Sequence, residues 1–142
     1  MFRIEVLVSL LFGLFTLTSG WGRPLQSSGA YGTLTCNGKP AKNVLVKLYD
    51  HDTFTTDDKM AETKTNLTGF FEISGKAREF TTINPELNIY HDCNDGIKPC
   101  LRVITLKINS SYVNFGEEAK NLYPVGTLEL AVKYPGEKRE CI

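Results

Sequence analysis

The sequence predicts an all-β protein, a two-sheet antiparallel β-sandwich of about seven strands. After residue 29, apolar residues recur with a period of two, which turns one face of each strand toward a core. Turn signals that contain Gly, Pro or Asn separate these apolar runs. Beyond the leader, the sequence has no sustained helical periodicity. Each sheet of such a sandwich buries one face and exposes the other.

The predicted strands and turns can be placed along residues 30–142. Asn37-Gly38-Lys39-Pro40 forms the first turn, and later strands follow Thr68-Gly69, Asn84-Pro85 and Tyr123-Pro124. The polar stretch 50–62 is predicted to be a loop that could include one short strand. The residues expected to face the core share the alternation: Ala30, Gly32, Leu34, Cys36, Val44, Val46, Leu48, Phe71, Ile73, Leu87, Ile89, His91, Ile104, Leu106, Ile108, Leu128, Leu130, Val132 and Tyr134.

Residues 1–20 have the features of a secretory signal peptide. Arg3 supplies the positive charge, residues 6–17 form an apolar run, and Thr18-Ser19-Gly20 offers small residues for cleavage. A membrane anchor would need about 20 apolar residues, so we expect no membrane span. The prediction is therefore a secreted, extracellular chain. Residues 21–29 lack periodicity and are predicted to be a flexible segment before the domain at 30–142.

The length and the charge balance limit the function further. The chain of 142 residues, less its leader, has room for one domain, and its 42% hydrophobic residues suffice for one core. Lys plus Arg and Asp plus Glu number 16 each, so the chain carries no net charge. This balance argues against a broad cationic field, and we expect no nucleic-acid partner.

Four cysteines, an even number, are typical of a secreted protein that oxidises all its thiols. Three pairings are possible. The turn-rich residues 94–99 bring the ends of their loop together, which favours Cys93 with Cys100 and leaves Cys36 for Cys141. The spacing of Cys93 and Cys100 is wider than in zinc knuckles, so we expect no metal site there.

Two triplets match the N-x-[ST] pattern of N-glycosylation. Asn66 precedes the Thr68-Gly69 turn, and Asn109 ends an apolar strand. Both positions are expected at surface corners. We therefore predict Asn66 and Asn109 as glycosylation sites.

Several separated motifs resemble one family. They are GTLTCNGKP at 32–40, VLVKL at 44–48, TGFFE at 68–72, IYHDC at 89–93, GTLEL at 126–130 and GEKREC at 136–141. In this order, with all four cysteines placed, they resemble the secreted transthyretin-like family that is expanded in nematodes. The resemblance covers essentially residues 30–141 and implies a transthyretin-like sandwich, secretion and an extracellular role. Residues 50–58, DHDTFTTDD, depart from it because they lack the proline expected in this loop.

Catalysis has little support in the sequence. The transthyretin fold also hosts a 5-hydroxyisourate hydrolase, which needs a histidine in its first strand and ends in Tyr-Arg-Gly-Ser. Residues 30–36 contain no histidine, and this chain ends in Arg-Glu-Cys-Ile. The sequence also lacks a Gly-x-Ser-x-Gly elbow. His91 is predicted to be a partly buried ring that donates to a backbone carbonyl. We expect no enzymatic activity and no cofactor.

The acidic loop is the one constellation with possible ligand chemistry. Asp50, Asp52, Asp57 and Asp58 offer the hard carboxylate oxygens that calcium prefers. Their spacing is not that of an EF-hand, and flexible acidic loops are more often simply solvated. These four aspartates are kept as possible ligand-binding residues, with no metal assigned.

The favoured function is recognition of an extracellular protein or lipid headgroup through loops at the end of a rigid sandwich. One family member is understood to bridge exposed phosphatidylserine to a phagocyte receptor. If that role applied here, basic residues would meet the headgroup: Lys39, Lys42, Lys98 and Arg102. The alternative is a carrier that holds a small apolar ligand at a subunit interface. Such a channel would be lined either by the face with Tyr31, Thr33 and Thr35 or by the face with Thr127, Glu129 and Lys133. The sequence leaves the partner and the oligomeric state open.

Overall fold

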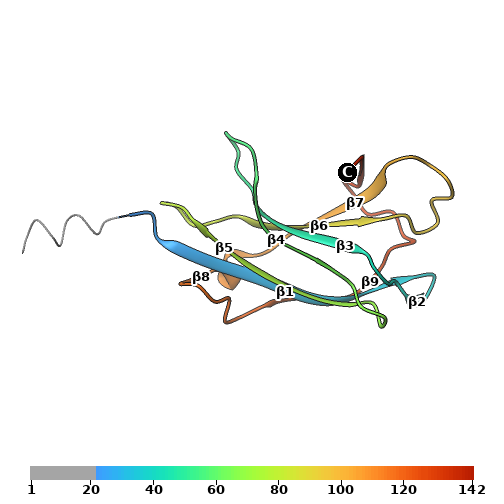
Figure 1. Ribbon diagram of the computed structural model, residues 1–142, viewed down its shortest axis with the longest axis horizontal. Helices are drawn as coiled ribbons and strands as arrows, with labels where there is room; N and C mark the ends of the chain where they lie inside the picture. The colour runs from blue at the N-terminus through green and yellow to red at the C-terminus, as the bar shows by residue number, and fades with distance from the viewer. Residues whose placement is uncertain (1–21) are drawn as a thin grey trace, which may run out of the picture.

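Residues 22–142 form two facing β-sheets, which Figure 1 shows in a computed structural model of the chain. The predicted signal peptide, residues 1–20, lies outside these described residues. The first sheet is built around β1 (Leu25–Cys36), which pairs with β2 (Lys39–Pro40), β5 (Phe70–Arg78), β8 (Asn114–Phe115) and β9 (Tyr123–Glu129). The second sheet has the order β10 (Lys138–Glu140), β7 (Leu101–Lys107), β6 (Pro85–His91), β3 (Leu45–Asp50) and β4 (Asp58–Lys64). A short 3₁₀ turn, η1 (Ser110–Tyr112), precedes β8.

The predicted all-β sandwich is confirmed, and seven of the described strands have six or more residues. One strand pair departs from the prediction, because β9 runs parallel to β1. The chain leaves the second sheet after β7 and pairs β8 antiparallel with the start of β1. It then turns back and runs beside β1 in the same direction. A parallel pair needs such a crossover, which alternation along the sequence does not reveal.

The core lies between the sheets, and the alternation identified it correctly along most strands. Val46 and Leu48 of β3 are fully buried opposite Ile89 and Leu87 of β6. Leu34 of β1 is buried against them from the first sheet. Fully burying such a side chain stabilises the fold by roughly 1.5–3 kcal/mol. The inward rows therefore hold the two layers together.

The predicted flexible segment is wrong for residues 25–29, which form the first part of β1. They pair with β5, where Leu25 lies opposite Arg78 and Gly29 opposite Ser74. Gln26 is buried, donates from Nε2 to the carbonyl of Thr81 at 2.8 Å and accepts from the Ile83 N–H at 3.0 Å. The segment lacks apolar periodicity because the side chains that it buries are polar. Gln26 and Ser28 form hydrogen bonds, whereas the Ser27 hydroxyl has no partner among the described residues.

The last predicted strand is also shorter than expected. β9 ends at Glu129, so the predicted inward row at Leu130, Val132 and Tyr134 is not a strand. Leu130 is buried, but Val132 is half exposed, and the Tyr134 hydroxyl donates to the Glu129 carbonyl at 2.8 Å. The chain then turns into the short strand β10.

The predicted disulfide pairing is wrong. The structure joins Cys36 to Cys93 and Cys100 to Cys141. Cys36 ends β1 in the first sheet and Cys93 follows β6 in the second, so their bond ties the two layers together. β10 pairs antiparallel with β7, with Glu140 opposite Leu101, and this register places Cys141 opposite Cys100. The first bond thus follows from the facing of the two sheets and the second from strand pairing, rather than from distance along the chain.

Within residues 22–142, none of the helices has the length and apolar character that crossing a membrane requires.

Candidate functional site

The sandwich has two ends with different chemistry. The acidic end consists of the β3–β4 loop, residues 51–57, and the β5–β6 loop, residues 79–84. The disulfide end consists of the β1–β2 turn, the β4–β5 turn, the β6–β7 loop and the residues around Cys141. In Figure 1 the acidic-end loops rise above and to the left of the sheets, and the loops of the disulfide end lie to the right.

The four predicted aspartates do not converge on one point. Asp50 is buried and accepts from the backbone N–H of Asn84 at 2.9 Å. Asp52 accepts from the N–H groups of Phe54 and Thr55, at 2.9 and 3.3 Å, and so shapes its own loop. These contacts make Asp52 a turn-forming residue.

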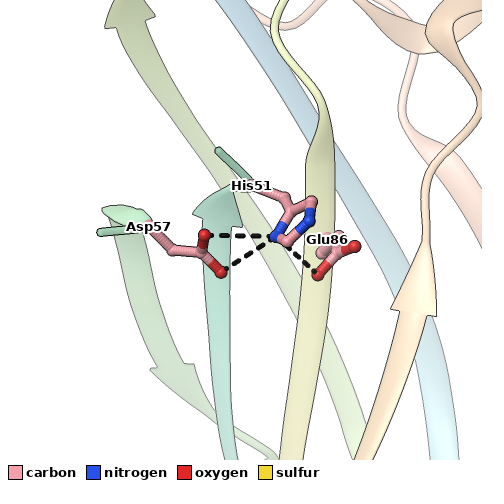
Figure 2. Close-up of side chains that lie close together, drawn as sticks. All are labelled: His51, Asp57 and Glu86. Carbon is pink, nitrogen blue, oxygen red and sulfur yellow. Dashed lines mark hydrogen bonds and ion pairs between the residues drawn. The ribbon is translucent and has the colours of Figure 1, made fainter. Parts of the chain in front are cut away.

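Asp57 and Glu86 share one partner, His51 (Figure 2). The Nδ1 atom of His51 lies 3.1 Å from Oδ1 of Asp57 and 3.9 Å from Oε2 of Glu86. All three side chains are partly exposed. The hydrogen bond that His51 donates to Asp57, followed by the charges of Glu86 and Asp57, raises the pKa of His51 above its ordinary 6.5. A second cluster consists of three carboxylate side chains, Asp50, Asp58 and Glu79, from each of which one oxygen lies within 4.8 Å of the others.

A polar cleft of about 190 Å³ opens at the acidic end. Its walls include Asp50, Asp52 and Glu79, together with Phe54, which is 95% exposed. Asp57, Asp58 and Glu86 do not line it. The structure thus divides the predicted acidic site among a cleft, a loop turn and two separate clusters of side chains.

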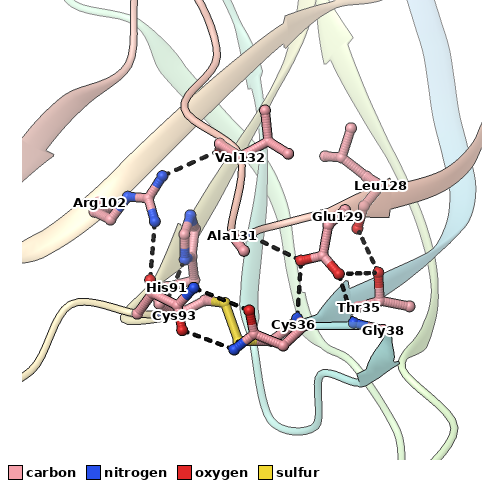
Figure 3. The surroundings of a disulfide bond; sticks show 12 residues. Thr35, Cys36, Gly38, His91, Cys93, Arg102, Leu128, Glu129, Ala131 and Val132 are labelled. Carbon is pink, nitrogen blue, oxygen red and sulfur yellow. Dashed lines mark hydrogen bonds between the residues drawn. A yellow bond between two sulfur atoms is a disulfide. The ribbon is translucent and has the colours of Figure 1, made fainter.

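At the disulfide end, Glu129 fixes the β1–β2 turn (Figure 3). Its carboxylate accepts from the N–H groups of Asn37, Gly38 and Ala131, at 3.0, 2.7 and 2.8 Å. The N–H bonds from Ala131 and Gly38 lower the pKa of Glu129. Asn37 and Gly38 both have positive φ, 54° and 76°, as the centre of a two-residue hairpin turn requires.

The β1–β2 turn is joined to the β6–β7 loop by two further links. Asn37 and Asn94 exchange two side-chain hydrogen bonds, at 2.7 and 2.9 Å. The Cys36–Cys93 disulfide lies beside them. In the same loop, Asp95 receives a hydrogen bond from Arg139 Nη1 at 2.8 Å, which holds the pKa of this carboxyl below its usual value. Backbone motion of this loop is therefore restricted at several points.

Arg102 and His91 lie beneath this loop, and both differ from their predicted roles. Arg102 is 4% exposed and donates to Glu137 and to the carbonyls of Cys93 and Val132, so it cannot meet a headgroup. His91 is buried, but its Nδ1 accepts from the Cys93 N–H at 3.1 Å instead of donating to a carbonyl. Its Nε2 has no hydrogen-bond partner among the described residues. Burial, followed by the charge of Arg102, lowers the pKa of His91.

The surface of the disulfide end carries apolar and basic side chains. Ile97 is fully exposed, and Leu67 and Ile142 are also exposed. The three other predicted basic residues are exposed as well: Lys39, Lys42 and Lys98. Lys42, Lys64 and Ile142 line one hollow of about 290 Å³. This end thus combines restrained loops with exposed lysines and exposed apolar side chains.

Both glycosylation sequons lie at exposed corners. The Asn66 Oδ1 accepts from Thr68 N–H at 3.0 Å and from its hydroxyl at 2.8 Å. The Asn109 Oδ1 accepts from Ser111 N–H at 2.9 Å. Glycosylation of Asn66 and Asn109 stays a prediction.

One of the two faces that the carrier alternative could use is mixed in character. On β1 and β5, Tyr31 lies opposite Glu72 and Thr33 opposite Phe70. A charged residue thus lies beside the aromatic ones. The carrier function stays a prediction that this face does not strengthen.

Sequence reasoning did not predict the organising role of three glutamates, Glu86, Glu129 and Glu137. Glu86 and Glu129 occupy positions in strands that alternation assigns to the solvent face. Glu137 lies in a turn before β10. Apart from Ala131, which lies two residues after Glu129, their partners are 35 or more residues away along the chain, so local patterns do not identify them.

Comparisons relate the chain to known proteins. The sequence profile of the transthyretin-like family matches residues 31–109. Transthyretin-like protein 5 of Caenorhabditis elegans is 58% identical over 118 residues, which cover 82% of this chain and 85% of that protein. Transthyretin-like protein 2 of the same nematode is 43% identical over 148 residues, covering 100% of this chain and 99% of that protein. A search of solved structures finds a 9R-lipoxygenase from Cyanothece PCC8801, which is 21% identical and matches 74% of this chain and 16% of the lipoxygenase chain. Its TM-score of 0.43 is too low to support a conclusion about this chain.

Proposed function

This chain belongs to the transthyretin-like family, and we propose that it is a secreted binding protein that contacts an extracellular partner through its disulfide end. Two disulfides among the described residues agree with folding in an oxidising compartment. The proposed role is recognition, with no catalytic step.

The full exposure of Ile97 carries the proposal. This isoleucine lies in the β6–β7 loop with 103% relative exposure, so it covers no part of the core. A single exposed apolar residue needs no explanation in a mobile loop. Here, however, Cys93 and Cys100, which bound the loop, are each bonded to another segment, and Asn37 and Arg139 hold its interior. A pre-ordered loop loses little conformational entropy on binding, which favours it as a contact surface.

The neighbouring charges favour an anionic partner surface. Lys98 follows Ile97 directly, and Lys39 lies in the turn that Asn37 and Asn94 join to this loop. Apolar side chains beside lysines suit the boundary between anionic headgroups and acyl chains. We therefore favour an anionic lipid headgroup, such as phosphatidylserine, as the partner. Arg102 is not part of this surface, because Glu137 holds it in the interior.

Vesicle binding tests the proposal. The oxidised protein is mixed with phosphatidylcholine vesicles with and without phosphatidylserine, and the sedimented fraction is measured. We expect binding only with phosphatidylserine and weakening by added salt. Each basic residue near an anionic surface contributes about 1 kcal/mol, so Lys39→Gln and Lys98→Gln should each weaken binding roughly fivefold.

Matched variants separate this surface from a general effect of exposed residues. Ile97→Ser should reduce binding, whereas Phe54→Ser, at an equally exposed position of the acidic end, should not. Equal binding to both kinds of vesicle would reject the lipid partner. Loss of binding in Phe54→Ser but not in Ile97→Ser would assign the contact to the opposite end. If no vesicle binds, an extracellular protein becomes the partner class to test.

A further inference from the structure

We propose that His51, Asp57 and Glu86 form a binding site for a divalent transition metal such as Zn²⁺ (Figure 2). The three residues come from different elements: His51 follows β3, Asp57 precedes β4, and Glu86 lies within β6. One donor atom from each lies within 4.8 Å of the other two. This site lies at the acidic end, so it does not depend on the function proposed for the disulfide end.

The three side chains by themselves carry a net negative charge. A protonated His51 contributes at most one positive charge, whereas Asp57 and Glu86 contribute two negative charges. The Nδ1 proton can be donated to Asp57, at 3.1 Å, but Glu86, at 3.9 Å, lies beyond hydrogen-bond distance. Lys107 lies opposite Glu86 on β7 and faces the group, yet within residues 22–142 Glu86 forms its ion pair with His51 alone. A dication bound to a neutral imidazole would balance both carboxylates.

The distances fit a tetrahedral ion after a small adjustment. Zinc binds imidazole nitrogen and carboxylate oxygen at about 2.0–2.2 Å, which places neighbouring donor atoms about 3.3–3.5 Å apart. The distance from Nδ1 to Asp57 is already close to this value. Glu86 would have to approach Nδ1 by about half an ångström, and the donor oxygens of Asp57 and Glu86, which lie within 4.8 Å of each other, would have to reach the same spacing. The partial exposure of the three side chains leaves a side open for a water molecule as the fourth ligand.

The donor types select the kind of metal. Calcium and magnesium prefer oxygen ligands alone, whereas imidazole suits zinc, copper and nickel. The second group, Asp50, Asp58 and Glu79, contains only carboxylates and therefore differs in its expected preference. Asp57 also accepts from the Asp52 N–H at 3.0 Å, so the metal would fasten the β3–β4 loop to β6.

Calorimetric titration of the oxidised protein with Zn²⁺, after treatment with a chelator, tests the site. We expect one bound ion per chain, a rise in melting temperature, and little competition from Ca²⁺. Asp57→Asn and Glu86→Gln keep the side-chain volume and should each weaken Zn²⁺ binding at least tenfold. The matched control is Asp58→Asn, which removes an adjacent carboxylate of the other group and should leave the affinity unchanged.

Protection from proteolysis supplies a second measurement. Zn²⁺ should slow cleavage within residues 51–57 in the parent protein but not in Glu86→Gln, and circular dichroism verifies that both are folded. Absence of Zn²⁺ binding, or unchanged affinity in both Asp57→Asn and Glu86→Gln, would overturn the proposal. Loss of binding in Asp58→Asn alone would also overturn it, because the ion would then occupy the cluster of Asp50, Asp58 and Glu79.

Discussion

Arg102 donates two hydrogen bonds to Glu137, from Nε to Oε2 at 3.0 Å and from Nη2 to Oε1 at 2.8 Å. The arginine side chain is 4% exposed and that of the glutamate 11%. Arg102 also donates to the Cys93 carbonyl, so the pair connects β7, the β6–β7 loop and the turn before β10. This arrangement is geometrically specific, because both guanidinium edges are occupied.

Removing the glutamate should destabilise the fold strongly. Glu137→Ala leaves the Arg102 guanidinium buried without a counter-charge, which typically costs 3–5 kcal/mol. Urea denaturation measures the free energy of unfolding. The control is Glu62→Ala, which breaks an exposed pair with Lys59 and should cost less than about 1 kcal/mol. Similar losses in the two variants would contradict a structural role for the buried pair.

The two histidines should titrate on opposite sides of pH 6.5. Burial and the charge of Arg102 lower the pKa of His91, whereas hydrogen bonding to Asp57 and the charge of Glu86 raise that of His51. The imidazole resonances in NMR spectra report both midpoints directly. A higher midpoint for His91 than for His51 would contradict the buried position of His91.

These shifts also have opposite effects on stability. Below pH 6.5 the unfolded chain protonates His91 while the folded chain resists it, so stability falls as the pH drops toward the folded pKa of His91. His51 adds stability below pH 6.5 that is lost as the pH rises through its raised folded pKa. Comparing urea midpoints at pH 7.5 and 5.5 in His51→Gln and the parent protein separates the two contributions. The parent should lose less stability on acidification than His51→Gln.

The disulfide connectivity can be checked chemically. Cleavage before Asp95 separates Cys93 from Cys100, and mass spectrometry of the unreduced peptides should then link Cys93 to Cys36 and Cys100 to Cys141. The cysteines of the first bond are 57 residues apart in sequence and those of the second 41. For loops of these lengths, the chain-entropy relation gives a stabilisation of about 4 kcal/mol for each bond. The double variant Cys36→Ser/Cys93→Ser should lose approximately this stability. A peptide that joins Cys93 to Cys100 would contradict the structure.

Glu129 should control the order of the β1–β2 turn. Its pKa is lowered in the folded protein by N–H donors, Ala131 first and then Gly38, so its contribution to stability is present above pH 4.5 and lost as the pH falls through the folded pKa. In Glu129→Gln this acid-dependent loss should shrink. Hydrogen exchange at Gly38 and Ala131 should accelerate in the variant. Unchanged exchange at both amides would show that the carboxylate does not hold the turn.

Period-two alternation predicted the strands well because each has one face in the core. Val46 and Leu48, and Leu87 and Ile89, are buried as expected. The same reasoning failed for Gln26 to Ser28, since polar side chains can be buried without any apolar signal, as Gln26 and Ser28 are with satisfied hydrogen bonds. It also failed beyond Glu129, where Leu130 is buried in a turn rather than in a strand.

The candidate sites were less predictable than the strands. Asp57 was identified from the density of aspartates in its loop, but its relation to Glu86 depends on β6 lying next to β3. Lys98 was correctly expected at the surface, whereas Arg102 was not, because only the position of Glu137 shows that the guanidinium is buried. Charge alone therefore could not distinguish a free cation from an internal ion pair.

The all-β class, the family and the oxidation of the cysteines could be predicted from the sequence, because they follow from local periodicity, motifs and residue counts. The folded structure was needed to show which cysteines pair, which carboxylates meet His51 and which basic residues are exposed. These properties depend on strands that are distant in sequence but adjacent in a sheet, and on burial, which sets whether a charge contacts water or another residue.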